Sequence, residues 1–363
     1  MIVSRGIRHG FSYADRTGYT LPGPPCDTES DRERRKKMIQ QQEKLGRVSE
    51  IRKNSFILSF EGRDIPAKLK GSFYEDAPER WPVVGDFVSF LENPAGDSVI
   101  VSVCERKSLL SRPDQAKTGV LQYMVANADY CFIVTALNED YSFNRIARYA
   151  SVALSGNSVP VVILTKADLC DNVARFVREA ESISDGIRVH AVSAKYGIGL
   201  EELKQYFVPG TTIALMGSSG AGKSTLINAI VGEEVMQTGE IREDDGKGRH
   251  TTTHRQMIRL PNDVWIIDTP GMREVGLASA DEGIDRTFAD ILALESRCRF
   301  RNCRHETESG CAVKAAIASG ELSRKRFELY KNLGKENADH RARKKEISKS
   351  VKAYKKSRNW TEE

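Results

Sequence analysis

The sequence predicts a multidomain protein with three folded regions: a small all-β barrel, an α/β domain built around a glycine-rich loop, and a mainly helical C-terminal domain. Five short alternating segments fall within residues 45–105, strand-like and helical patterns alternate over residues 106–275, and three cysteines and a histidine cluster within residues 276–363. A polar arm, residues 1–44, precedes them. The chain of 363 residues is long enough for two or three domains with separate cores.

Composition argues against a secreted or membrane-embedded protein. No apolar stretch approaches the roughly 18 residues of a membrane span, and the N-terminus lacks a signal-peptide core. Seven cysteines, an odd number, suit a reducing compartment, where clustered cysteines bind metal more often than they form disulfides. We therefore expect a cytoplasmic protein.

The positive charge is a property of the C-terminal tail. The formal charge is +5, and residues 321–363 alone carry 14 Lys and Arg against 7 Asp and Glu. Such a tail favours an anionic partner, with nucleic acid ahead of membrane because no apolar face alternates with the charges. A solvated helix of mixed charge is the alternative.

The arm and the barrel region differ sharply in pattern. The arm is rich in proline, glycine and charge and cannot bury enough apolar surface to order itself, although its run RERRKK could contact phosphate. The barrel region contains the strand-like segments GRVSEI, SFILSF, IPAKLK, DFVSFL and SVIVSV. Five short strands in about sixty residues favour an OB-fold, which commonly binds oligonucleotides. A structural barrel without a ligand is the alternative.

The region that follows has the pattern of a parallel sheet. Helical stretches such as FNRIARYASVAL and LEELKQYF separate five apolar runs of strand length, at residues 130–137, 159–165, 187–193, 211–216 and 264–269. Buried strands that alternate with helices form a mostly parallel sheet covered on both faces.

A phosphate-binding pattern, G-x-x-x-x-G-K-[ST], lies between the fourth of these strands and a helix start. Its glycines let backbone N–H groups close around phosphates. Lys223 would reach the β- and γ-phosphates, and Ser224 would ligate Mg²⁺. The predicted phosphate-binding residues are Gly217, Ser218, Ser219, Gly220, Ala221, Gly222, Lys223, Ser224 and Thr225.

Two loops upstream of this pattern are predicted to bind and recognise a guanine base. Thr165-Lys166-Ala167-Asp168 lies at the C-terminal end of a buried strand, where α/β sheets bind ligands. The Asp168 carboxylate can accept hydrogen bonds from the guanine N1–H and exocyclic amine, whereas adenine presents an acceptor at N1 and would leave groups unpaired. Lys166 would pack along the base. Ser193-Ala194-Lys195, after the next strand, resembles a second guanine-contacting loop.

Two downstream segments would complete the site. Asp268 ends a strand and suits the carboxylate that holds Mg²⁺ through water, and Gly271 could offer its N–H to the γ-phosphate. In GKGRHTTTHR, one threonine should join the metal shell. Thr253 is the choice, with Thr252 next. A polar loop without this role is the alternative.

A second candidate metal site follows in SRCRFRNCRHETESGCAV. Cys298, Cys303, His305 and Cys311 would complete a tetrahedral Zn²⁺ shell without an open position, so the metal would be structural. Four arginines, at 297, 299, 301 and 304, interleave with these ligands and suit contact with RNA phosphates.

The order of these motifs is a rotation of the usual GTPase order. The chain resembles the circularly permuted GTPases, and with the barrel and the cysteine cluster it is similar to the ribosome small-subunit-dependent GTPase A family. Permutation is tolerable because the ends of a compact domain often lie close together. The resemblance implies GTP hydrolysis with Mg²⁺, one structural Zn²⁺, and a monomer that binds the small (30S) ribosomal subunit and its 16S rRNA in late maturation. Hydrolysis would be stimulated by the subunit and promote release.

GTP hydrolysis also needs a residue that orients the attacking water. Met272 stands where many GTPases carry glutamine and cannot orient water, so His250 in the threonine segment is the candidate catalytic residue, together with Lys223. A non-catalytic RNA-binding module that senses guanine nucleotide is the competing hypothesis. An ATPase is a weaker one, against which Asp168 argues.

Overall fold

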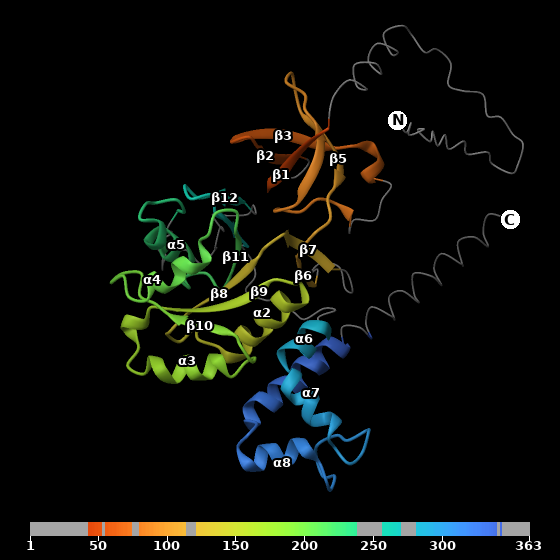
Figure 1. Ribbon diagram of the computed structural model, residues 1–363, viewed down its shortest axis with the longest axis vertical. Coiled ribbons are helices and arrows are strands. Elements are labelled where there is room, and N and C mark those ends of the chain that lie inside the picture. The colour runs from red at the N-terminus through yellow and green to blue at the C-terminus, as the bar shows by residue number, and fades with distance from the viewer. Residues whose placement is uncertain are drawn as a thin grey trace, which may run out of the picture. The chain divides into compact units, whose positions relative to one another are not determined.

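The computed structural model describes residues 43–52, 55–74, 80–113, 121–237, 256–269, 281–339 and 342 (Figure 1). The arm up to residue 42 and the tail beyond residue 342 therefore lie outside the described residues. None of the described helices is long and apolar enough to cross a membrane.

The first described region is a closed barrel with the strand order β1-β2-β3-β5-β4. Its elements are β1 (Lys44–Ile51), β2 (Phe56–Phe60), β3 (Arg63–Leu69), η1 (Gly71–Tyr74), β4 (Phe87–Leu91) and β5 (Ser98–Val103). Only β3 and β5 pair in parallel. Successive side chains of a strand face opposite sides, so Val48, Val88 and Phe90 fill the barrel and are fully buried. The predicted five-stranded barrel is confirmed.

A two-stranded sheet that the sequence did not predict follows the barrel. β6 (Leu109–Pro113) pairs antiparallel with β7 (Leu121–Ala126), with a register shift between Leu110 and Ser111. Leu110, Met124 and Val125 are buried in the same core as one face of the central sheet. These strands are short, and their burial depends on a neighbouring domain, which no local pattern reveals.

The central sheet has six strands in the order β10-β9-β8-β11-β13-β12. Five are parallel, and the edge strand β12 runs antiparallel to β13. The strands are β8 (Tyr130–Ala136), β9 (Val159–Thr165), β10 (Arg188–Ala191), β11 (Thr212–Met216), β12 (Met257–Arg259) and β13 (Trp265–Asp268). The predicted parallel sheet is confirmed, whereas the three-residue β12 was too short to predict.

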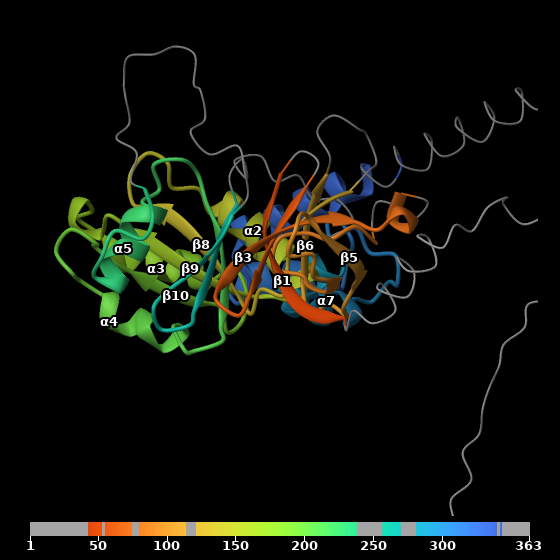
Figure 2. The same cartoon turned by 90° about the horizontal axis from the view of Figure 1, so that it is seen from above.

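Helices cover both faces of this sheet, as Figure 1 shows; Figure 2 gives the same elements seen from above. Along β8, Cys131 and Ile133 belong to one core with α2 and α3, whereas Phe132 and Val134 belong to another with α4, η4 and α5. This alternation explains why the strands are apolar throughout. The bounds are α2 (Phe143–Ser155), η3 (Ala167–Leu169), α3 (Val173–Glu181), α4 (Leu200–Leu203), η4 (Lys204–Tyr206) and α5 (Lys223–Val231).

The C-terminal region is helical, as predicted. It comprises α6 (Asp281–Thr287), α7 (Ala289–Ser296), α8 (Ala312–Ser319) and a further helix over residues 324–339, here called the C-terminal helix. The helix α6 packs closely against α2: a Cβ at Gly283 would lie 2.0 Å from the Ser151 carbonyl oxygen. The hydroxyls of Ser151 and Thr287 are 3.1 Å apart in the same contact.

A buried arginine joins the barrel to the central sheet. Arg47 of β1 donates to Thr212 Oγ1 at 2.7 Å, and its guanidinium lies over the rings of Phe87 and Trp265, 4.8 and 5.3 Å from their centroids. Burial lowers the pKa of Arg47 to about 10, so it stays charged at neutral pH. Because Thr212 and Trp265 begin β11 and β13, this contact lies at the N-terminal edge of the parallel strands, and the opposite edge carries the loops.

Candidate nucleotide-binding site and metal cluster

The glycine-rich loop connects the end of β11 to the start of α5. Gly217 has no room for a side chain, because a Cβ there would lie 2.3 Å from the Val134 carbonyl oxygen. Gly222 takes a φ of +89° directly before the helix, a conformation that other residues rarely adopt. The loop thus brings backbone N–H groups to a helix N-terminus, an arrangement suited to anions.

Lys223 reaches back into this loop. Its Nζ donates to the carbonyl oxygens of Gly217 at 3.1 Å and Ser218 at 2.9 Å, so the ammonium lies against the loop backbone that the sequence predicts to bind phosphates. Ser224 is half-buried in the first turn of α5, and Thr225 is exposed. Of the remaining loop residues, Ala221 is buried, whereas Ser219 and Gly220 are exposed.

The first predicted guanine loop is tied to the phosphate loop. Thr165 ends β9, and its Oγ1 donates to the Ala221 carbonyl oxygen at 2.6 Å, with both residues almost fully buried. Lys166 takes a positive φ of 56°, and Asp168 is exposed in η3. Because strands β9 and β11 flank β8 in a parallel sheet, their loops emerge at one edge, and the hydroxyl bonds them together.

The second predicted guanine loop is tied to the first. The Ala167 N–H donates to the Val192 carbonyl oxygen at 3.1 Å. Ser193 exchanges two backbone hydrogen bonds with Ile198, at 3.0 and 3.1 Å, which closes the loop that contains Ala194 and Lys195. Ser193 is buried, Ala194 is half-buried and Lys195 is exposed. Three of the predicted nucleotide-binding segments are therefore hydrogen-bonded to one another.

Asp268 lies at the same edge, at the end of β13 and in register with Leu215 of β11. Its Oδ1 is buried and has no hydrogen-bond partner among the described residues. Burial raises the pKa of Asp268, and the charge of Lys223 and the Thr269 N–H counteract part of that shift. A buried carboxylate oxygen without a partner is unfavourable in the protein alone and fits a cation that would bind there. His250, Thr252, Thr253, Gly271 and Met272 lie outside the described residues.

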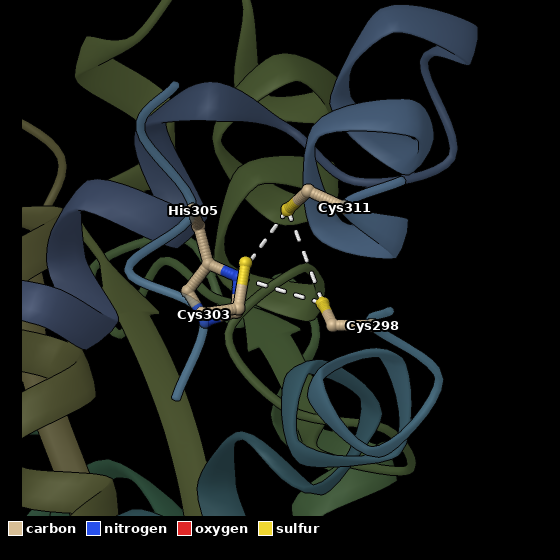
Figure 3. A group of neighbouring side chains, drawn as sticks. All are labelled: Cys298, Cys303, His305 and Cys311. Carbon is tan, nitrogen blue, oxygen red and sulfur yellow. Dashed lines mark hydrogen bonds between the residues drawn. The ribbon is translucent and has the colours of Figure 1, made fainter. Parts of the chain in front are cut away.

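The four predicted metal ligands converge in the C-terminal region (Figure 3). Their ligand atoms all lie within 4.8 Å of one another. Cys311 Sγ is 3.3 Å from His305 Nδ1 and 3.9 Å from Cys298 Sγ, and Cys298 Sγ is 3.7 Å from that nitrogen. Tetrahedral zinc would separate such donors by about 3.5–3.8 Å. Three thiols and an imidazole at these distances could hold a metal ion.

The same segments match known proteins. The RsgA GTPase family model matches residues 103–278. The small ribosomal subunit biogenesis GTPase RsgA 1 of Listeria innocua is 41% identical over 326 residues, which cover 86% of this chain and 92% of the relative. A counterpart in Methanosarcina acetivorans is 40% identical over 289 residues, covering 79% and 78% of the two chains. The chain belongs to the RsgA GTPase family.

Two solved structures have a fold similar to that of this RsgA family member. YjeQ from Thermotoga maritima superposes with a TM-score of 0.61 at 29% identity, covering 80% of this chain and 97% of that chain. YloQ, described as a circularly permuted GTPase, gives a TM-score of 0.58 at 22% identity and covers 82% and 96% of the two chains. The permuted multidomain fold expected from the motif order is confirmed.

Sequence reasoning missed several residues that support the sites in this RsgA family member. Asp140, in the loop after β8, accepts a hydrogen bond from Ser218 Oγ in the phosphate loop and pairs with Arg145 at 2.7 Å. Glu295 Oε1 lies 3.0 Å from His305 Nε2, and Tyr330 donates to the other oxygen of Glu295 at 3.3 Å. The position of Asp140 in the polar loop that follows β8 was a signal for it, whereas nothing local marked Glu295.

Proposed function

We propose that this chain hydrolyses GTP and acts in the assembly of the small ribosomal subunit. One observation supports the nucleotide site above all: Thr165, in the predicted guanine loop, donates to Ala221 in the phosphate loop, so two motifs 56 positions apart share a buried hydrogen bond. The relatives' names, small ribosomal subunit biogenesis GTPases, support the second half of the proposal.

The guanine base would be read by the two loops after β9 and β10. Asp168 would accept from the N1–H and the exocyclic amine, and Lys166 would cover a face of the ring. Ala167, Ser193, Ala194 and Lys195 would line the remaining edge. Because Asp168 is exposed in the protein alone, the base can reach the carboxylate without displacing a protein partner.

The phosphates would be held by the loop N–H groups and by Lys223, which would exchange its two carbonyl acceptors for phosphate oxygens. Mg²⁺, when bound, neutralises charge on the transferring phosphoryl group. Ser224 and Thr253 would ligate it, and Asp268, with its unpartnered Oδ1, would hold it through water. Gly271 would donate its N–H to the γ-phosphate.

His250 would orient the attacking water, because Met272 lacks a polar atom to do so. A His250→Ala variant should bind GTP normally and lose turnover. Unchanged turnover in the presence of small subunits would overturn this role.

The metal of the C-terminal cluster would be Zn²⁺. Three thiolates and one imidazole form a closed tetrahedral set, which leaves no position for substrate, so the ion would be structural. Metal analysis of the purified chain should give one zinc per molecule. The half-buried Glu295 contact would fix the His305 tautomer, with Nε2 protonated and Nδ1 facing the metal.

The barrel, the arginines around the metal cluster and the basic tail would contact 16S rRNA in the 30S subunit, in the cytosol. We expect a monomer in which the GTP state favours docking and hydrolysis favours release. Predicted domain boundaries at residues 44, 105 and 275 form part of this proposal.

The decisive experiment measures GTP turnover with and without purified small subunits. Strong stimulation supports the proposal. Guanine-nucleotide binding without turnover in either condition would instead favour the non-catalytic RNA-binding module.

A further inference from the structure

We propose that Phe300, exposed between two of the metal-cluster cysteines, stacks on an unpaired base of RNA while the neighbouring arginines bind the flanking phosphates. This inference rests on the proposed function, because it assigns a specific contact to the RNA partner. It concerns the ring of Phe300 in the turn between Cys298 and Cys303, which is neither a predicted metal ligand nor part of the nucleotide site.

The turn presents an aromatic ring from a restrained backbone. Phe300 is 43% exposed, and the Arg299 guanidinium lies 5.5 Å from its ring centroid. The Cys303 N–H donates to the Phe300 carbonyl oxygen at 3.2 Å, and the Arg299 N–H donates to the Gly310 carbonyl oxygen at 3.0 Å. Cluster cysteines bracket the turn on both sides, so little conformational freedom remains to be lost when a ligand stacks on the ring.

The charge around this ring selects a polyanion. Arg297, Arg299, Arg301 and Arg304 are all exposed, and no carboxylate among the described residues forms an ion pair with them. The nearby glutamate side chains interact with other groups. Glu308 accepts from the backbone N–H groups of residues 304, 306 and 307, Glu306 pairs with Lys331 at 3.2 Å, and Glu295 faces His305. Four guanidinium groups within eight residues complement a phosphate backbone.

The exposed aromatic ring favours a partner that has an unpaired base. Bases within an A-form helix are covered on both faces by their neighbours, whereas an unpaired base can stack on an aromatic side chain. A purely apolar protein partner would leave the four arginines without acceptors. The combination of an exposed ring and flanking guanidinium groups therefore fits a single-stranded loop or bulge of RNA.

The test compares three substitutions of Phe300 in the full-length protein. Phe300→Trp keeps a stacking face, Phe300→Leu keeps an apolar side chain without one, and Phe300→Ala removes both. Each variant is titrated with a fluorescent single-stranded 12-mer RNA of mixed sequence, with the corresponding duplex, and with small subunits. Arg301→Ala probes the charge, and Arg178→Ala, at an exposed position on α3, removes the same charge elsewhere. Zinc content is measured for every variant.

We expect the leucine and alanine variants to bind the single strand about 5- to 100-fold more weakly, and the tryptophan variant to bind it as wild type does. The slope of log affinity against log salt should be unchanged in all three. Arg301→Ala should reduce that slope by about 0.7, and Arg178→Ala should leave it unchanged.

Wild-type affinity of both the leucine and alanine variants would overturn the proposal. RNA affinity retained by Phe300→Leu as fully as by Phe300→Trp would also overturn it, because that result would indicate an apolar protein contact. Loss of zinc in the Phe300→Ala variant would overturn it too, because that result would indicate a structural role. If subunits fail to stimulate turnover while the oligonucleotide result holds, the proposed function fails alone. If stimulation is normal and Phe300 has no effect, this inference fails alone.

Discussion

Thr165→Val would remove one hydroxyl from the nucleotide site and keep the shape of the side chain. The lost bond joins Oγ1 to the Ala221 carbonyl oxygen at 2.6 Å, between residues that are 3% and 1% exposed. A buried carbonyl that loses its donor costs about 1–3 kcal/mol. We therefore expect the free energy of unfolding to fall by about that amount. Thr165→Ser, which keeps the hydroxyl, should lose less.

The position of this bond also predicts which ligands are affected. The hydroxyl holds the phosphate loop, although Thr165 belongs to the predicted guanine loop. Because a loosened phosphate loop must be ordered again on binding, pyrophosphate and GDP should both bind Thr165→Val more weakly, by up to about 100-fold. Urea denaturation measures the stability, and competition against a fluorescent guanine nucleotide measures the affinities. Weaker GDP binding with unchanged pyrophosphate binding would refute the reasoning, because it would confine Thr165 to the base.

Three further substitutions address the other contacts. Glu295→Gln should weaken zinc binding about 10- to 100-fold in chelator competition, whereas Glu306→Gln, at an exposed pair with Lys331, should not. Asp168→Asn should shift the binding preference from GTP to xanthosine triphosphate, since the amide can donate to the oxygen that replaces the guanine amine. An unchanged preference in a competition assay would contradict the role of Asp168 in recognising guanine. Burial raises the pKa of Asp268, so the stability that its protonated form provides is lost as pH rises through that pKa. Asp268→Asn should therefore raise the melting temperature of the metal-free protein at neutral but not acidic pH, and abolish the added stability from Mg²⁺ with GTP.

Features that depend on local backbone chemistry could be predicted from the sequence. Gly222 precedes α5 with a φ that favours glycine, so the phosphate-loop pattern carries its geometry within a few residues. The metal ligands are close in sequence, and the apolar runs of the central sheet are long because both faces are covered. Each of these features can be recognised in the sequence without knowledge of the tertiary structure.

Contacts between distant segments could not be predicted in this way. Ser218 and Asp140 are 78 positions apart, and Arg47 and Thr212 are 165 apart. Each pair consists of common polar residues, whose partners are decided by the sheet order and by the packing of whole domains. The three residues of β12 are likewise a strand only because β13 lies beside them.

The two flanking domains are both fixed to the nucleotide domain by buried arginines. Arg326 of the C-terminal helix forms two hydrogen bonds to Asp290, at 2.6 and 3.0 Å, and donates to the Ser182 carbonyl oxygen at 2.7 Å and to the carbonyls of Ile183 and Thr287. A desolvated guanidinium is unfavourable unless its acceptors match the planar fork, so this contact specifies an orientation and not merely an attraction. Ser182 caps the C-terminus of α3, the helix that follows the loop with Asp168. Asp290 lies on α7, the helix that carries Glu295 beside the metal cluster. The metal cluster and the predicted guanine loop are therefore connected through rigid elements and one arginine. A lysine at either arginine position would keep the charge and lose the geometry that aligns the domains.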